Sequence, residues 1–225
     1  MKIIDLTHTI LRKGQPAWPG TEPPKFEVGN RIDVDGFRET LITMFSHTGT
    51  HTDAPYHYML NGTTLEKLPI DMFVGKALVI DATDLKDSES GIIDMKYIEP
   101  VIEKANQADF LLFKTGWDAY WATDKMFDKW PCPGDDVCNY MLETGKKGIG
   151  VEVLSIDPLD DDKDPLSPEY QYRHKIVLKN NNFIIIENLC NLDQCGNDLF
   201  TFINLPLKYE EADGAPSRAI AILED

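Results

Sequence analysis

The side chains best suited to chemistry lie in one short window, "SHTGTHTDAPYHY". It holds three of the chain's five histidines, His47, His51 and His57, together with Asp53. Imidazole nitrogens and carboxylate oxygens are ligands that Zn²⁺ and related divalent ions take from proteins. Four such side chains in so short a stretch predict a metal site. The alternative is a polar loop whose side chains bond to the backbone.

The spacing of these residues determines which backbone conformation could bring them to one metal ion. A helical zinc site is excluded, because Thr, Gly and Thr separate His47 from His51 and Pro55 follows soon after. In an extended chain, at about 3.3 Å per residue, the Cα atoms of these two histidines lie roughly 13 Å apart. One ion reaches both only if the chain bends, and Gly49 can adopt the positive φ of such a bend. Two nitrogens, the Asp53 oxygen and a hinge suit Zn²⁺, with Mn²⁺ as the alternative.

Composition narrows the class of protein. The 225 residues suit a single domain spanning 1–225, and 42% hydrophobic residues are enough for a core. A net charge of −16 argues against nucleic acid and anionic membranes and favours a small-molecule substrate. No apolar run is long enough to span a membrane, and the N-terminus lacks a signal-peptide pattern. Four cysteines without a CxxC motif predict free thiols and a cytoplasmic location.

The elements that must position the window are short strands alternating with helices. Buried strands are expected at 2–6, 76–82, 109–115, 148–156, 182–189 and 219–223, and a hairpin at 26–45 that turns at Asp35–Gly36. Helices are expected at 95–106, 135–146 and 167–179, the last with Ser167 as N-cap, and a loop at 157–165. This alternation predicts an α/β domain with a central mixed sheet flanked by helices.

The window also carries a resemblance to a known family. "HTGTHTDAPYH" resembles the HxGTHxDxPxH signature of the cyclase family of metal-dependent hydrolases, which includes bacterial kynurenine formamidases and isatin hydrolases. Similar blocks follow in the family's order, among them "NGTTLEKLPIDMFVGKALVIDAT", "LLFKTGW", "SIDPL", "FIIIENL" and "PLKYEEADGAPSRAIAI". The resemblance covers essentially the whole chain and implies the family's α/β fold.

The resemblance implies a set of metal ligands. It makes His47, His51 and Asp53 the ligands of a first ion, with Asp53 bridging to a second ion that His174 and Glu187 complete. One or two Zn²⁺ ions per subunit are therefore expected. Without the resemblance, nothing about His174 indicates a metal ligand. Glu187 follows four apolar residues, and a carboxylate in apolar surroundings needs a counter-charge.

The resemblance also implies the residues that act on the substrate and the assembly. His57 matches the family's acid/base, and an unperturbed imidazole titrates at about pH 6.5. Trp18 matches an aromatic residue lining the substrate pocket, the alternative being a turn aromatic packed beside Pro19. The expected assembly is a homodimer or homotetramer.

The implied activity is hydrolysis of a C–N amide bond of a small substrate by a metal-activated water. The first substrate is N-formyl-L-kynurenine, which would make the protein an arylformamidase of tryptophan catabolism. Isatin or another cyclic amide or lactone comes second. A non-catalytic metal-binding protein on the same scaffold is the alternative from another class. A serine triad is disfavoured because no GxSxG motif is present, and no cysteine lies near a histidine in sequence.

Several residues stand outside this scheme. Glu152 occupies a position where the resemblance leads us to expect Asp, and residues 121–136 match no block of the family. His8 is expected to be a satisfied residue at a strand end. Arg218 is expected to form a structural ion pair.

Overall fold

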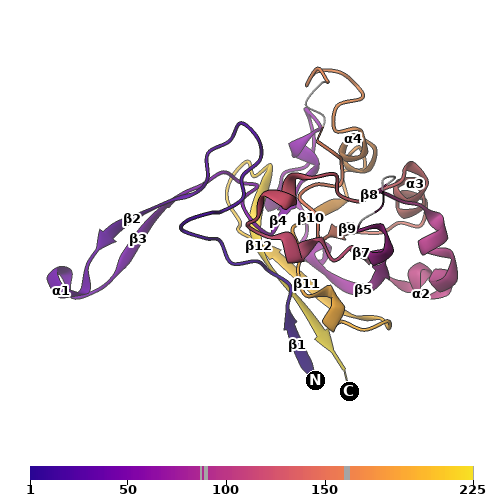
Figure 1. Cartoon of the computed structure of the whole chain (residues 1–225), viewed down its shortest axis with the longest axis horizontal. Helices are drawn as coiled ribbons and strands as arrows, with labels where there is room; N and C mark the ends of the chain where they lie inside the picture. The colour runs from indigo at the N-terminus through magenta and orange to yellow at the C-terminus, as the bar shows by residue number, and fades with distance from the viewer. Residues whose placement is uncertain (87, 89–90, 160–162, 225) are drawn as a thin grey trace.

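A computed structural model describes residues 1–86, 88, 91–159 and 163–224, and its main feature is one mixed sheet that closes on itself (Figure 1). Across the sheet the strands are β1 (Lys2–Asp5), β12 (Gly214–Leu223), β11 (Phe200–Pro206), β5 (Val74–Asp81), β7 (Phe110–Lys114), β9 (Gly148–Val151), β10 (Ile184–Glu187) and β4 (His51–Asp53). β4 pairs with both β10 and β12, so the strands from β12 round to β4 form a barrel-like ring. The predicted mixed sheet is confirmed.

The apolar runs in the sequence belong to the parallel part of this sheet. β5, β7, β9 and β10 are parallel neighbours, and parallel strands are buried on both faces. In β10, for example, Ile184 and Ile186 belong to the core inside the ring, whereas Ile185 belongs to the core beneath the helices. Two cores therefore share one set of strands, and this is why the runs show no polar alternation.

Helices cover the outer side of the parallel strands (Figure 1). The α-helices are α1 (Ile32–Asp35), α2 (Ile102–Gln107), α3 (Asp135–Glu143) and α4 (Tyr172–Leu178). The 3₁₀ helices are η1 (Pro55–His57), η2 (Leu65–Lys67), η3 (Ile70–Phe73), η4 (Thr83–Leu85), η5 (Met95–Tyr97), η6 (Glu99–Val101), η7 (Trp117–Tyr120), η8 (Asp124–Phe127) and η9 (Leu192–Gln194).

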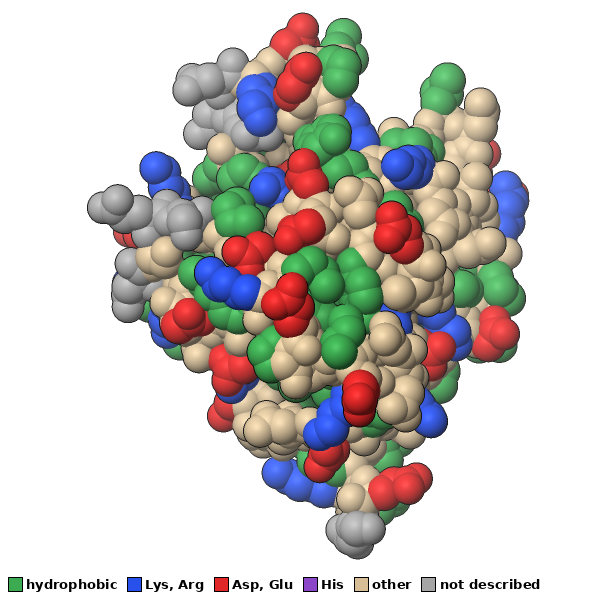
Figure 2. Space-filling view, turned by 90° about the vertical axis from the view of Figure 1, so that its right-hand side faces the viewer, with side chains coloured by type: hydrophobic (Ala, Val, Ile, Leu, Met, Phe, Trp, Pro, Cys, Tyr) green, Lys and Arg blue, Asp and Glu red, His purple; other side chains and the backbone are tan. Residues whose placement is uncertain are grey.

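On the side of the molecule that lies opposite the hairpin of β2 (Lys25–Asn30) and β3 (Glu39–Thr43), hydrophobic side chains are scattered among acidic and basic ones (Figure 2). Among the described residues no helix is long and apolar enough to cross a bilayer.

Two of the predicted helices differ from the structure in kind or extent. The predicted helix at 95–106 is divided into η5, η6 and α2, since Pro100 lacks an N–H and disfavours a continuous α-helix. The predicted helix at 135–146 is confirmed as α3 but ends earlier, where Gly145 takes φ +66°.

The start predicted for the third helix is wrong. α4 begins at Tyr172, whereas Ser167 lies in a preceding turn in which its hydroxyl accepts the Tyr170 N–H. The cap of α4 comes from a distant loop, because the Asp157 carboxylate accepts the backbone N–H groups of Arg173 and His174. A cap supplied by another segment has no local signature. Residues 160–162 of the predicted loop at 157–165 lie outside the described residues.

A two-stranded arm projects from the body of the molecule (Figure 1). It consists of β2 (Lys25–Asn30) and β3 (Glu39–Thr43), with α1 at its tip. The predicted hairpin at 26–45 is confirmed, and Gly36 makes the turn with φ +81°, but the short helix α1 precedes it. A further small pair joins β6 (Ile92–Ile93) in parallel to β8 (Cys132–Pro133), and β8 lies within residues 121–136.

The sheet next to the functional window depends on a glycine in β9. A Cβ on Gly148 would lie 2.6 Å from the backbone oxygen of Ile184 in β10. We expect Gly148→Ala to lower the free energy of unfolding by about 1–3 kcal/mol through overpacking. Gly29→Ala in the arm is the comparison variant: its Cβ would lie 3.3 Å from the backbone oxygen of Glu39, so it should cost less than Gly148→Ala. Urea denaturation measures both, and equal midpoints for the two variants would contradict this packing constraint.

Candidate metal centre

Two antiparallel strands bring the first three polar side chains together. His51 and Asp53 alternate onto one face of β4, and Glu187 of β10 stands directly opposite His51 in the register. The Nε2 atom of His51 lies 3.3 Å from Oδ1 of Asp53 and 3.4 Å from Oε2 of Glu187. Pairing of two buried strands therefore places an imidazole between two carboxylates.

The predicted bend between the first two histidines is present. Gly49 takes φ +70°, and the rings of His47 and His51 come within 5.0 Å of one another. Nδ1 of His47 lies 2.7 Å from Oδ1 of Asp53. The window thus folds back on itself at Gly49 and supplies three groups to one point.

His174 reaches the same point from α4, as the resemblance implied. Its Nε2 atom lies 3.5 Å from Oδ2 of Asp53 and 3.3 Å from Oε1 of Glu187. Its Nδ1 atom lies 2.7 Å from Oδ2 of Asp157, the carboxylate that also caps α4. One aspartate therefore sets both the start of the helix and the orientation of the ring.

The electrostatics of this cluster follow from its burial. Burial alone would raise the pKa of Asp53, but His47 and His51 outweigh it and hold that pKa well below its usual range. Burial alone would lower the pKa of His51, but the carboxylates of Asp53 and Glu187 outweigh this effect and raise that pKa to about 10. Opposite charges thus stabilise one another where water is excluded.

The donor set fits a divalent cation. Oδ2 of Asp53 is buried and accepts no hydrogen bond, an arrangement that costs free energy unless the atom has another partner. His51, Asp53 and Glu187 each offer a ligand atom within 4.8 Å of the others, and so do His47, Asp53 and His57. Nitrogen and oxygen donors of this kind suit Zn²⁺ or Mn²⁺. These two groups contain four of the five ligands that the resemblance implied, His47, His51, Asp53 and Glu187, and also His57. The fifth, His174, lies 3.3 Å from Glu187 through its Nε2 atom.

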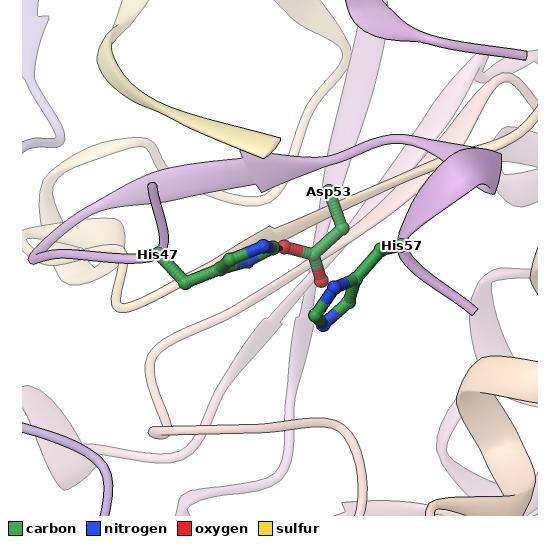
Figure 3. Close-up of side chains that lie close together, drawn as sticks. All are labelled: His47, Asp53 and His57. Atoms are coloured by element: carbon green, nitrogen blue, oxygen red, sulfur yellow. Dashed lines mark hydrogen bonds and ion pairs between the residues drawn. The ribbon is translucent and has the colours of Figure 1, made fainter. Parts of the chain in front are cut away.

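His57 lies beside this set, on η1. Figure 3 shows its ring and that of His47 flanking the carboxylate of Asp53. The two rings stack at 3.9 Å, and Nδ1 of His57 lies 3.8 Å from Oδ2 of Asp213. Burial and then the neighbouring His47 lower the pKa of His57 to about 3, so this imidazole is neutral near pH 7.

The cluster opens into a pocket with aromatic walls. Trp18 lines this pocket, in the place that the resemblance implied. Other aromatic rings on the lining are Phe45, Tyr58, Trp121 and Tyr170. Aromatic walls of this kind favour a flat apolar ring.

The residues outside the predicted scheme have structural partners. His8 stacks on Trp121 at 4.1 Å, and burial lowers its pKa to about 4. Its buried Nε2 atom has no hydrogen-bond partner among the described residues, so the expectation of a satisfied histidine is wrong. Glu152 accepts the N–H groups of Thr115 and Gly116, and burial followed by Asp118 raises its pKa to about 7. The expected ion pair of Arg218 is confirmed, with Asp5 as its partner at 2.9 and 2.6 Å. The four cysteines are free, as predicted.

Sequence reasoning missed several residues of the site. Asp157 and Asp213 stand in blocks that carry the family resemblance, but neither has a spacing that indicates contact with a histidine. Asn188 follows Glu187 with φ +57°, and Gln171 precedes α4 with φ +48°, and both line the pocket. A left-handed residue other than glycine at a pocket is typical of a functional site, but no sequence pattern reveals it.

Proton release should accompany metal binding at this cluster. Because the pKa of His51 is raised to about 10 in the metal-free protein, an incoming ion must displace its proton. We therefore expect Zn²⁺ affinity to rise from about pH 6 to about pH 8, with proton release on binding. Calorimetry in buffers of different ionisation enthalpy measures both quantities. An affinity that is flat or falls over this range would contradict the arrangement of charges.

Comparison with known proteins places the chain among relatives of the same length. A family model described as "Putative cyclase" matches residues 4–158. Kynurenine formamidase from Bacillus thuringiensis subsp. konkukian (strain 97-27) is 31% identical over 218 residues, which are 96% of this chain and 95% of that protein.

Solved structures show the same fold. Isatin hydrolase A from Ralstonia solanacearum has a TM-score of 0.85 at 24% identity, covering 99% of this chain and 92% of that chain. A protein described as a "Potential Metal-Dependent Hydrolase With Cyclase Activity" has a TM-score of 0.75 at 26% identity, covering 98% and 96%. Since the family model spans well over half of its length, the chain belongs to the cyclase family.

Proposed function

We propose that this protein is a metal-dependent hydrolase that cleaves a C–N amide bond, with N-formyl-L-kynurenine as its substrate. One observation carries the proposal. A buried cluster of imidazoles and carboxylates opens into an aromatic pocket, with a neutral histidine at its border. The likeness to kynurenine formamidases over nearly the whole chain supports this choice of substrate.

The residues of the chain divide the reaction between them. His47, His51, Asp53, His174 and Glu187 would hold one or two ions, with Zn²⁺ as our first choice and Mn²⁺ as the second. A divalent ion there would polarise the formyl carbonyl and acidify a water molecule. His57 takes a proton from the attacking water as its oxygen bonds to the formyl carbon. As the C–N bond breaks, His57 returns that proton to the amine nitrogen, and the product leaves as formic acid, which loses its remaining acidic proton to solvent as formate.

The pocket accounts for the choice of an aromatic substrate. Trp18 and Trp121 line it on segments far apart in the sequence, and stacking on an aryl ring would hold the formamide beside His57. Isatin is the second candidate, because it is a flat cyclic amide and the fold matches isatin hydrolase A. A non-catalytic metal-binding protein is the alternative from another class. The presence of His57 beside the five proposed ligands counts against it, because metal binding alone needs no acid/base.

Two variants separate metal binding from proton transfer. Asp53→Ala should lose both bound Zn²⁺ and turnover of N-formyl-L-kynurenine. His57→Ala should keep its Zn²⁺ and lose about 10²- to 10⁴-fold in kcat. Elemental analysis and a panel of formamides, cyclic amides and lactones measure both properties. Loss of metal in His57→Ala would make that residue a ligand, and full activity of Asp53→Ala would refute the mechanism.

We also propose that the protein is a cytoplasmic homo-oligomer, a dimer or tetramer, and that the arm is the contact between copies. Seven of its side chains are large, hydrophobic and exposed: Val28, Ile32, Val34, Phe37, Leu41, Ile42 and Phe45. Residues 25–45 hold three basic and four acidic side chains, a net charge of −1, in a chain whose net charge is −16. An apolar, nearly neutral arm lets two acidic copies meet with little repulsion, and exposed apolar patches of this kind are typical of interfaces.

The arm gives this assembly a direct test. Phe37→Ser combined with Leu41→Ser should lower the mass measured by light scattering to that of a monomer, because it removes apolar contact area. Leu166→Ser is the matched control, since Leu166 is 92% exposed and lies outside the arm. A parent protein that is monomeric, or a double variant that keeps its mass, would count against the arm as the contact.

A further inference from the structure

We propose that Asp213 is the positioning residue of His47: its carboxylate accepts the Nε2–H of that ring and so leaves Nδ1 facing Asp53. The inference rests on the proposed metal centre and adds a residue to it. Oδ2 of Asp213 lies 3.0 Å from Nε2 of His47, on the side of the ring away from Asp53. Nδ1 of the same ring lies 2.7 Å from Oδ1 of Asp53.

In each of the other two histidines of the cluster, one ring nitrogen also faces an outer acceptor and the other faces the carboxylates. His51 directs Nδ1 to the backbone oxygen of Gly49 at 2.8 Å and Nε2 to the carboxylates. His174 directs Nδ1 to Asp157 at 2.7 Å and Nε2 to the carboxylates. A neutral imidazole has one N–H, so the outer acceptor decides which nitrogen keeps a lone pair for an ion. His47 is the reverse case, with Nδ1 inward, and it needs an acceptor at Nε2.

The backbone around Asp213 is built to seat this ring. β12 begins at Gly214, which pairs with Asp53 across the seam between β12 and β4. A Cβ on Gly214 would lie 2.4 Å from Cε1 of His47 and 2.9 Å from its Nε2. The absence of a side chain at this position therefore makes the space in which His47 lies.

Three further contacts hold the carboxylate in place. The backbone oxygen of Asp213 accepts the Ala54 N–H at 2.9 Å, which fixes the residue beside the end of β4. The hydroxyl of Ser46 donates to Oδ2 at 3.2 Å. The hydroxyl of Tyr209 donates to the backbone oxygen of Gly214 at 2.5 Å and lies 3.3 Å from Oδ1 of Asp213. Because the imidazole stands between Asp213 and Asp53, this carboxylate acts through the ring rather than on the ion.

Zn²⁺ titration of the full-length chain tests the assignment. Asp213→Ala should bind Zn²⁺ about 10- to 100-fold more weakly than the parent, as is typical when the outer partner of a metal-binding histidine is lost. Asp213→Asn should lie between the two, since its amide oxygen can still accept from Nε2. Gly214→Ala should also weaken binding by displacing the ring. Glu210→Gln, which removes an exposed charge three residues away, is the control and should match the parent.

A nitrogen-15 NMR spectrum of the Zn²⁺-loaded protein gives a readout that a general loss of packing would not move. We expect His47 to carry its proton on Nε2 in the parent and to lose this preference in Asp213→Ala, while His51 and His174, which have other outer acceptors, keep their protonation. Unchanged affinity in Asp213→Ala, or a parent His47 protonated on Nδ1, would overturn the inference alone. An Asp213→Asn loss as large as that of Asp53→Ala would make Asp213 a ligand and overturn it as well. A parent that binds no Zn²⁺ would overturn the proposed function together with it.

Discussion

The buried carboxylate of Asp53 is the constraint on which the rest of the structure depends. Its side chain has no exposure to solvent, and an unpaired charge in such a place would cost several kcal/mol. Three imidazoles from β4, from the turn before it and from α4 meet this charge within 3.5 Å. The closure of the sheet and the position of α4 therefore have one shared requirement, which is to bring positive charge to one point.

The imidazoles are in turn held from outside the cluster. The acceptors come from a glycine carbonyl in the bend, from the loop that caps α4, and from the residue that precedes β12. These segments lie far apart in the chain, so the donor set exists only when the whole domain is folded. Two aspartates, the buried Asp157 and the partly exposed Asp213, orient histidines, so the fold is organised around the site as much as around its two apolar cores.

Much of this arrangement can be predicted from sequence, and the exceptions have a common cause. The odd-numbered spacing of His51 and Asp53 and the hinge at Gly49 are local, and the structure has both. The parallel strands are also local, since their apolar runs reflect burial on both faces. The start of α4 and the contact between Asp213 and His47 depend on residues distant in sequence, and no local pattern encodes them. The five residues that could hold an ion could be named together only through the family resemblance, because His174 has no feature of its own.

The seam of the barrel has a consequence for how the protein responds to its ion. β4 is three residues long, yet it joins β10 to β12 and also carries His51 and Asp53. Opening the ring at this strand would also separate the ligand side chains. An ion bound there would therefore stabilise the closed ring, and the free energy of unfolding would rise with the concentration of the ion. The melting temperature of this domain would then serve as a gauge of the free cation in its surroundings.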